Sequence, residues 1–290
     1  MTATPHAPTR IETFCTSGTS PTATYSLTGH RGPVVLLLGG ISATAEPGWW
    51  SDLLGAKRPL DTARFRVLSV AFDGVDTRTQ ALRLLSLLDE LGIEHLSAAV
   101  GCSYGGMVCL QLAALAPERV GSLVVVGATH RAHGLTLGWH HIQQGILALA
   151  TRLGRPEDGV ALARALAMTT YRSDRELDER FDRDSLASWL DHHGAVYSKT
   201  VPNARYAALS QAIASHAVDP ASLRVPLTLI GFDSDLLAPP WLLEELAQAA
   251  PECRAHHTLP SVHGHDAFLL ETDALAAPLY DALRPVGVSA

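Results

Sequence analysis

The sequence predicts an α/β fold, in which a mostly parallel β-sheet is flanked by helices and interrupted by a helical insertion. Short, largely apolar runs such as residues 34–38 and 96–100 have the length of buried strands, and they alternate with helical spacing such as that of residues 79–91. Between residues 129 and 215 this alternation stops, and helical patterns follow one another without a convincing strand. Repeated strand–helix–strand order is typical of a parallel sheet that is covered on both faces.

The remaining elements follow from the same patterns and from their boundary residues. Gly92 stops the helix of residues 79–91, and Pro117 closes the helix that comes next. Further strands are expected at residues 25–30, 65–72, 120–126, 225–230 and 254–259, a helix or turn at residues 49–54, and further helices at residues 107–116, 139–149, 157–169, 184–192, 241–249 and 273–283.

Length and composition limit the class of protein. The chain has 290 residues, of which 47% are hydrophobic and 18% charged, and its net charge is -7. These values are ordinary for a soluble protein and argue against nucleic-acid binding, which would need a basic patch. The longest apolar runs are only strand-length, so no membrane span is expected. Residues 1–10 are polar and lack the apolar stretch of a signal peptide, so we expect a frayed start.

The cysteines and histidines do not suggest a metal site. No CxxC pair occurs, which argues against a zinc site or a disulfide framework and fits a reducing cytoplasm. The 14 histidines show neither HExxH nor a similar ligand spacing. We therefore expect a cytoplasmic protein without a bound metal. The cysteines are Cys15, Cys102, Cys109 and Cys253.

The stretch Gly101-Cys102-Ser103-Tyr104-Gly105 joins an apolar strand to an apolar helix. So sharp a turn strains its central residue, and small neighbours are needed for strand and helix to approach each other. Gly101 and Gly105 supply those small neighbours. The turn lifts the Ser103 hydroxyl above the sheet edge and aims the first N–H groups of the helix at the same spot. Ser103 is therefore the predicted nucleophile.

A serine nucleophile needs an imidazole base, and the imidazole needs a carboxylate that orients it. In the α/β-hydrolase arrangement these groups follow in the order serine, acid, histidine. Ser103, Asp235 and His265 supply that order, each just after a predicted strand. Asp233 is an alternative to Asp235, which we favour because it lies further beyond the strand end. His263 is an alternative to His265, and spacing alone does not choose between them.

Two backbone N–H groups are expected to form an oxyanion hole. A pair of glycines ends the strand of residues 34–38 and lets the backbone turn its N–H groups toward a ligand, so that of Ile41 is one predicted donor. The N–H of Tyr104 at the helix start is the other. The chemistry predicted from these groups is acyl transfer through an acyl-Ser103, with water or another alcohol as the acceptor.

The helical stretch divides the chain into three parts. We expect residues 1–129 and 216–290 to form the two parts of the core and residues 130–215 to form a helical lid. An insertion that follows the strand after the nucleophile turn would cover the active site, exclude water and shape the pocket.

Longer motifs resemble the homoserine O-acyltransferase family of the α/β-hydrolase superfamily, whose members make O-acetyl- or O-succinyl-homoserine for methionine synthesis. The runs Thr-Tyr-Arg-Ser and Gly-His-Asp-Ala-Phe are more specific than the serine turn. The segments that resemble family motifs are residues 48–52, 59–62, 101–107, 163–173, 180–181, 189–194, 234–235 and 264–269.

This resemblance implies the triad Ser103, Asp235 and His265 within an α/β-hydrolase fold. It also implies that Arg172 binds the α-carboxylate of homoserine and Asp266 its α-amino group, since an amino acid needs an opposed cation and anion and a planar guanidinium suits a carboxylate. The expected activity is acyl-CoA-dependent O-acylation of L-homoserine, with acyl-CoA as a co-substrate and no bound cofactor. A homodimer formed through the lid is also expected.

The chain departs from the family at positions that bear on its substrates. The segment after Phe72 is much shorter than in typical members, and Thr200 stands where the family has an arginine, for which Arg205 is a candidate substitute. Residues 38–43 look most like the succinyl-using branch, and Arg131 is a candidate partner for the second carboxylate of that donor. The alternatives are an acyltransferase for another hydroxy amino acid such as L-serine, and an esterase or thioesterase with the same triad.

Overall fold

The structure is a computed structural model and describes residues 10–15, 22–72 and 74–284. Its centre is an eight-stranded sheet with the order β1-β2-β4-β3-β5-β6-β7-β8. Neighbouring strands are parallel from β4 to β8, whereas β2 is antiparallel to both β4 and β1. The strands are β1 (Arg10–Cys15), β2 (Thr22–Thr28), β3 (Val34–Leu38), β4 (Arg66–Val70), β5 (Ala98–Cys102), β6 (Leu123–Val126), β7 (Leu227–Phe232) and β8 (Cys253–Leu259).

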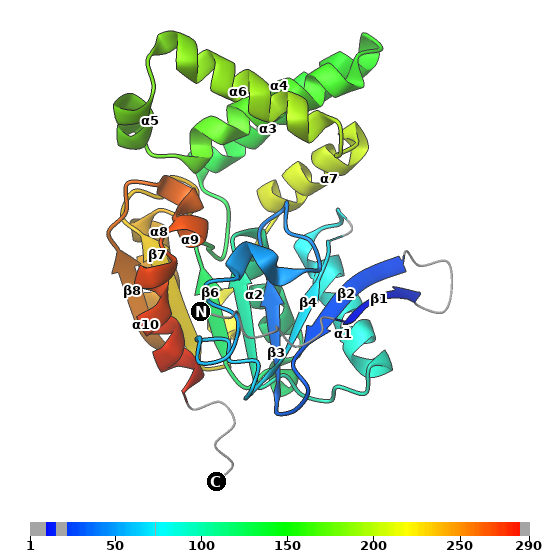
Figure 1. Cartoon of the computed structure of the whole chain (residues 1–290), viewed down its shortest axis with the longest axis vertical. Helices are drawn as coiled ribbons and strands as arrows, with labels where there is room; N and C mark the ends of the chain where they lie inside the picture. Colours follow the sequence, from blue (N-terminus) through cyan, green and yellow to red (C-terminus); the bar gives the residue numbers. More distant parts are fainter. Residues whose placement is uncertain (1–9, 16–21, 73, 285–290) are drawn as a thin grey trace, which may run out of the picture.

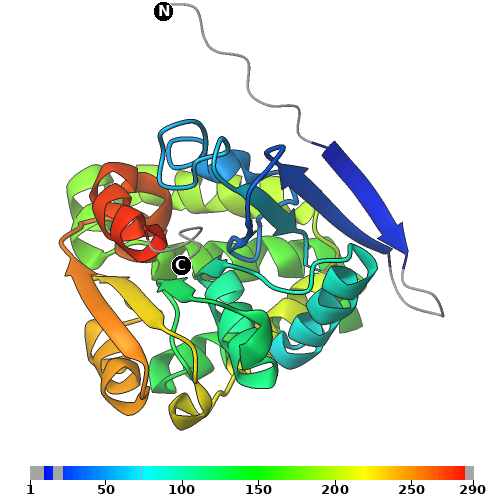
Figure 2. The ribbon, with the colours of Figure 1, turned by 90° about the horizontal axis from the view of Figure 1, so that it is seen from below.

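Helices cover both faces of this sheet. Figure 2 shows α1 (Thr77–Glu90), α2 (Tyr104–Leu115) and α8 (Pro240–Ala249) on one side and α10 (Thr272–Leu283) on the other. Alternate residues of β3 belong to different cores, with Leu36 and Leu38 packed on the α1–α2 side and Val35 and Leu37 on the α10 side. A strand that is buried on both faces has apolar side chains at every position, which explains its continuous apolar run.

Five helices between β6 and β7 form a separate layer, which we call the lid. Figure 1 shows this green-to-yellow layer above the sheet. The lid has an apolar cluster of its own that contains Leu147, Val160, Ala163 and Tyr206. Its helices are α3 (Gly134–Arg152), α4 (Pro156–Tyr171), α5 (Asp174–Arg180), α6 (Arg183–Ser198) and α7 (Asn203–Ala214).

The predicted mostly parallel sheet with flanking helices is confirmed, and the predicted strands are present within a few residues. β1, α5 and α7 were not predicted. The Ser173 side chain accepts a hydrogen bond from the Glu176 N–H and starts α5. The remaining short elements are η1 (Pro47–Trp50), η2 (Pro117–Arg119), η3 (Pro220–Ser222), η4 (Gly264–Asp266) and α9 (Ala267–Leu270).

Two expectations, on the start of the chain and on membrane spans, can be compared with the structure only over the residues that it describes. The expected frayed start falls mostly on residues 1–9, which lie outside them. Across residues 10–15, 22–72 and 74–284, no helix combines the length and the apolar character that a membrane crossing requires.

Candidate active site

The turn between β5 and α2 holds Ser103 in a strained backbone conformation, with φ 53° and ψ -124°. Gly101 and Gly105 flank it, and glycine is needed at both positions because another backbone segment passes too close to leave space for a side chain. A Cβ atom at Gly101 would lie 2.5 Å from the carbonyl oxygen of Gly105, and one at Gly105 would lie 2.5 Å from that of Gly39. Only glycine fits at both positions, so the turn presents the Ser103 side chain at the carboxyl end of the sheet.

Ser103, His265 and Asp235 form a hydrogen-bonded line. The Oγ of Ser103 lies 2.7 Å from Nε2 of His265, and Nδ1 of His265 lies 2.8 Å from Oδ2 of Asp235. His265 and Asp235 are both buried. This arrangement allows the imidazole to accept the serine proton while the carboxylate orients the ring.

The structure brings Asp235, and not Asp233, to this line. The second carboxylate oxygen of Asp235 accepts hydrogen bonds from the backbone N–H groups of Leu237 and Ala238, at 2.8 and 3.0 Å, which hold it in place. Asp233 instead accepts from the N–H of Ser261 and joins two loops. Asp235 therefore orients the imidazole of His265, whereas Asp233 holds two loops together.

A glycine that sequence reasoning did not single out packs against the acid–base pair. Gly127 follows β6 with φ +56°, and a Cβ atom there would lie in van der Waals contact, at 3.6 Å, with both Asp235 Oδ2 and His265 Cε1. Any other residue would be strained by the positive φ. A glycine directly after the strand that follows the nucleophile turn was the available signal.

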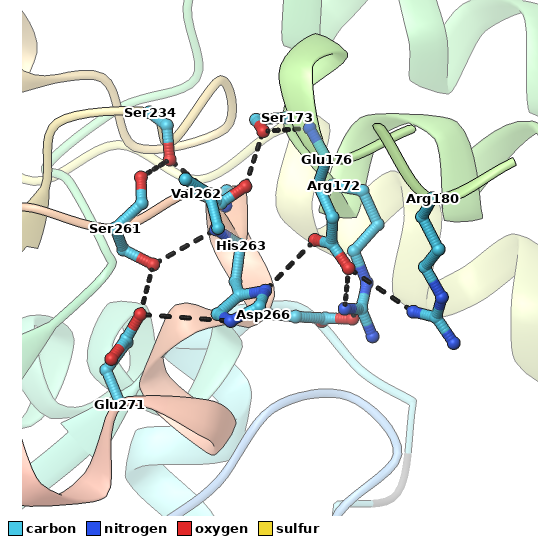
Figure 3. Close-up of polar contacts among 11 residues, drawn as sticks. Arg172, Ser173, Glu176, Arg180, Ser234, Ser261, Val262, His263, Asp266 and Glu271 are labelled. Carbon is cyan, nitrogen blue, oxygen red and sulfur yellow. Dashed lines mark hydrogen bonds and ion pairs between the residues drawn. The ribbon is translucent and has the colours of Figure 1, made fainter. Parts of the chain in front are cut away.

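His263 lies away from Ser103, on the other side of the same loop. Its Nδ1 faces Glu176 of α5 at 3.3 Å, and its Nε2 lies 3.9 Å from Glu271. Figure 3 shows this imidazole between the two carboxylates. His263 therefore joins the lid to the core, whereas His265 faces the nucleophile.

The electrostatics of His265 suit a general base. Burial alone lowers the pKa of His265, but the charge and the hydrogen bond of Asp235 raise it, and Asp266 adds to them, so that the pKa lies above its ordinary value. A raised pKa makes the imidazole a stronger proton acceptor in its neutral form.

The predicted oxyanion donors lie beside the nucleophile. A Cβ atom at Gly40 would lie 3.8 Å from that of Ser103, so the turn after β3 passes close to the site. Ile41, the next residue, lines the same cavities as Ser103. Tyr104 is the first residue of α2, and its side chain is fixed by a hydrogen bond to the Val75 carbonyl at 2.7 Å.

A pocket of about 410 Å³, here called the outer pocket, opens from Ser103 and His265. Most of its wall is apolar, but Glu46, Arg164 and Asp266 bring charged groups to it. The Arg164 guanidinium lies 4.4 Å from the ring centroid of Tyr197 and 5.1 Å from that of Tyr171. Sequence reasoning did not select Arg164 as a site residue, although it lies in the motif that contains Arg172.

Arg172 and Asp266, which were expected to bind opposite charges of the substrate, form an ion pair with each other instead. Nε of Arg172 lies 3.0 Å from Asp266 Oδ2, and its Nη1 lies 2.7 Å from Glu176 Oε1. Arg172 is thus held between two carboxylates (Figure 3), and only Asp266 of this pair lines the outer pocket. Burial raises the pKa of Asp266, although Arg172, His265 and Arg164 oppose the shift.

Three further sequence candidates lie elsewhere. Arg131 is bound through two nitrogens by Glu245 and lines neither cavity at Ser103, so the structure does not support it as an acyl-carboxylate ligand. Arg205 donates to the carbonyl of Phe72 at 2.9 Å, and the Thr200 hydroxyl donates to a carbonyl of its own turn. Within the described ranges no three His, Cys, Asp or Glu side chains gather as metal ligands.

A strained serine turn, an in-line Ser–His–Asp arrangement and a mostly parallel sheet define a protein of the α/β-hydrolase class, and residues 33–272 match the family described as alpha/beta hydrolase fold. The sequence is 37% identical to the homoserine O-succinyltransferase of Xanthomonas campestris pv. campestris, over 92% of this chain and 80% of that protein. It is 33% identical to a homoserine O-acetyltransferase of Thermus thermophilus, over 84% of this chain and 73% of that protein. The chain belongs to the homoserine O-acyltransferase family.

Solved structures agree with this fold. The homoserine O-acetyltransferase from Bacillus anthracis superposes with a TM-score of 0.84 over 98% of both chains at 16% identity. Esterase E22 superposes with a TM-score of 0.83 over 95% of this chain and 99% of its own, at 18% identity. At such identities the likeness concerns the fold alone, which transferases and esterases share.

Proposed function

We propose that this protein is an acyl-CoA-dependent O-acyltransferase that acylates the hydroxyl of L-homoserine, a step of methionine biosynthesis. The observation that carries the proposal is the line from Ser103 through His265 to Asp235, which opens into a pocket with an acidic and a basic side chain. The relatives named as homoserine acyltransferases support the class of reaction. Free buried thiols at Cys102 and Cys109 are compatible with the cytoplasm that we expect.

In the first half-reaction His265 takes the proton of Ser103 as the hydroxyl oxygen attacks the thioester carbonyl. The N–H groups of Ile41 and Tyr104 stabilise the resulting oxyanion, and one such donor is typically worth ~3 kcal/mol. The carbon–sulfur bond then breaks, the His265 proton passes to the thiolate, and coenzyme A leaves as a free thiol. The acyl group remains as an ester on Ser103.

In the second half-reaction the homoserine hydroxyl takes the place of the thiol. His265 removes its proton, the oxygen attacks the acyl-Ser103 carbonyl, and the bond to Ser103 Oγ breaks as that oxygen regains a proton from His265. Asp266 is proposed to bind the α-amino group and Arg172 the α-carboxylate. Asp266 lies on the wall of the outer pocket and pairs with Arg172, which does not line it, so the Arg172 guanidinium would have to turn toward the pocket to bind the carboxylate.

Acetyl and succinyl donors are both represented among the relatives. The relative at 37% identity is named for succinyl transfer and the one at 33% for acetyl transfer, so we propose succinyl-CoA as the preferred donor. L-Serine differs from homoserine by one methylene, which pockets discriminate by only about 1–3 kcal/mol. An esterase is the alternative from a different class, since water could collect the acyl group from the same triad.

The test is the intact mass of the protein after brief mixing with succinyl-CoA and, separately, with acetyl-CoA. We expect a single acyl adduct, absent from Ser103→Ala, that L-homoserine discharges rapidly and water slowly. An adduct that water removes as fast as homoserine does would point to a hydrolase. No adduct from either donor would refute the transferase proposal.

A homodimer through the lid is a second part of the proposal. Several large apolar side chains of the lid are exposed, and burying them in a partner subunit would be favourable. Light scattering should then give twice the 30.9 kDa of the chain, and Ile142→Arg should halve that mass. A monomeric native protein would rule the dimer out. The exposed residues are Leu135, Leu137, Ile142, Leu149, Leu153, Leu162 and Val196.

A further inference from the structure

A second, smaller cavity of about 40 Å³ also reaches Ser103 and His265. We call it the inner cavity. It lies between the core and the lid helix α3, and both cavities share Ser103, His265, Ile41 and Tyr171. A substrate group that enters by the outer pocket and reacts at Ser103 therefore has a second space available beyond the nucleophile.

One wall of the inner cavity is polar and comes from a single face of α3. Thr136, His140 and Gln143 are spaced by four and three residues, so they lie on the same side of the helix, and all three are buried. The hydroxyl of Thr136 has no hydrogen-bond partner among the described residues, although the side chain is only 2% exposed. A buried hydroxyl without a partner is destabilising unless a ligand or an ordered water satisfies it.

His140 and Gln143 both line the inner cavity. The Nδ1 of His140 lies 2.9 Å from the Ser210 hydroxyl. Burial lowers the pKa of His140 to about 4, so the ring is neutral and carries one proton. The Gln143 amide carries two N–H donors, which can serve a ligand in the inner cavity.

The other walls are apolar, with Ile41, Met107 and Leu237 among the lining residues. No Asp, Glu, Lys or Arg side chain is among the described residues that line the inner cavity. The inner cavity therefore combines an apolar path with uncharged hydrogen-bond donors on α3, which suits a short hydrocarbon chain that ends in an acceptor.

We propose that the inner cavity is the acyl subsite and that it takes a short acyl chain with a terminal carboxylate, such as a succinyl group, whose oxygens accept hydrogen bonds from Thr136 and Gln143. This inference rests on the proposed function, since it assumes an acyl-Ser103. The space corresponds to about three water molecules, roughly the size of two methylenes and a carboxylate, and an acetyl methyl would leave most of it unfilled.

The test compares the rate constants for acylation of Ser103 by succinyl-CoA and acetyl-CoA, measured from release of free thiol. Thr136→Val removes the hydroxyl and keeps the shape. We expect it to lower the succinyl-to-acetyl ratio by roughly tenfold or more, because a hydrogen bond to a charged acceptor is lost. Gln143→Leu should lower the same ratio, and Thr136→Ser, which keeps a hydroxyl, should preserve it.

The matched control is Thr151→Val on the same helix, where the hydroxyl donates to the Leu147 carbonyl and does not line the inner cavity. Its ratio should equal that of the native protein. An unchanged ratio in both Thr136→Val and Gln143→Leu, or equal losses with both donors, would overturn the acyl subsite. A native enzyme that accepts acetyl-CoA and not succinyl-CoA would overturn it while leaving the transferase intact, whereas acylation by neither donor would overturn the proposed function as well.

Discussion

Asp235 and Asp233 lie two positions apart, yet their surroundings give them different tasks. Asp235 is 1% exposed and divides its two oxygens between His265 and the backbone of the following turn. Asp233 ties the end of β7 to Ser261. The path of the loop after β7 therefore brings Asp235, and not Asp233, to His265. Substitutions of these two aspartates can be compared directly.

Asp235→Asn should lower kcat by about 10³–10⁴-fold, because the amide neither holds the required tautomer nor stabilises the imidazolium. Asp233→Asn keeps an acceptor for Ser261 and should stay within about threefold of the native kcat. Steady-state kinetics of both variants check this. A loss in Asp233→Asn as large as that in Asp235→Asn would contradict the assignment.

The raised pKa of His265 predicts the acid limb of the pH–rate profile. The neutral imidazole is the active form, so the acylation rate should fall as the pH drops through the pKa of His265, with a midpoint above 6.5. Burst measurements of thiol release across pH 5–9 would locate the limb. A midpoint clearly below 6.5 would show that burial outweighs the Asp235 charge.

At the scale of elements, the short helix α5 links the lid to the loop that carries His265. Its Glu176 is 7% exposed and faces three cationic or titratable groups, Arg172 at 2.7 Å and Arg180 and His263 at 3.3 Å. The Ser173 hydroxyl that caps α5 also donates to the Val262 carbonyl (Figure 3). The position of α5 therefore determines how Arg172 and Asp266 meet.

Glu176→Gln should impair the amino-acid half-reaction more than the acylation of Ser103. Loss of the buried charge leaves Arg172 paired with Asp266 alone, so we expect the KM for homoserine to rise roughly tenfold or more while the thiol burst stays near native. The matched control is Glu179→Gln on the same helix, whose exposed carboxylate pairs with the exposed Arg175. Equal effects on burst and KM would indicate general damage to the lid.

At the scale of the whole molecule, buried histidines make stability depend on pH. Burial lowers the pKa of His140 and of His216 to about 4, below the ordinary value of 6.5. As the pH falls below 6.5 the unfolded chain binds protons that the folded chain does not, so the free energy of unfolding decreases. His265 has the opposite shift and opposes part of this change.

Between pH 7.5 and 5 the free energy of unfolding should decrease by roughly 2 kcal/mol for each of these two histidines. Urea unfolding at several pH values measures this, and His216→Gln should reduce the slope with pH. A flat profile in the native protein would contradict the prediction.

The parallel sheet, the serine turn and the order of serine, acid and histidine could be predicted from the sequence. These features depend on local rules, namely the apolar periodicity of strands and helices and the small residues that a sharp turn demands, and such rules act over a few neighbouring positions. Helix α5 escaped prediction because a helix of only seven residues owes most of its stability to tertiary packing rather than to its own residues.

Which groups share a cavity depends on tertiary packing. The path of the loops after β7 and β8 placed Asp235 and His265 at Ser103, and the lid set Arg164 in the outer pocket. The inner cavity exists because α3 lies across the carboxyl end of the sheet with Thr136 turned inward. Contacts between residues far apart in the chain depend on the packing of whole elements, and no local pattern encodes that packing.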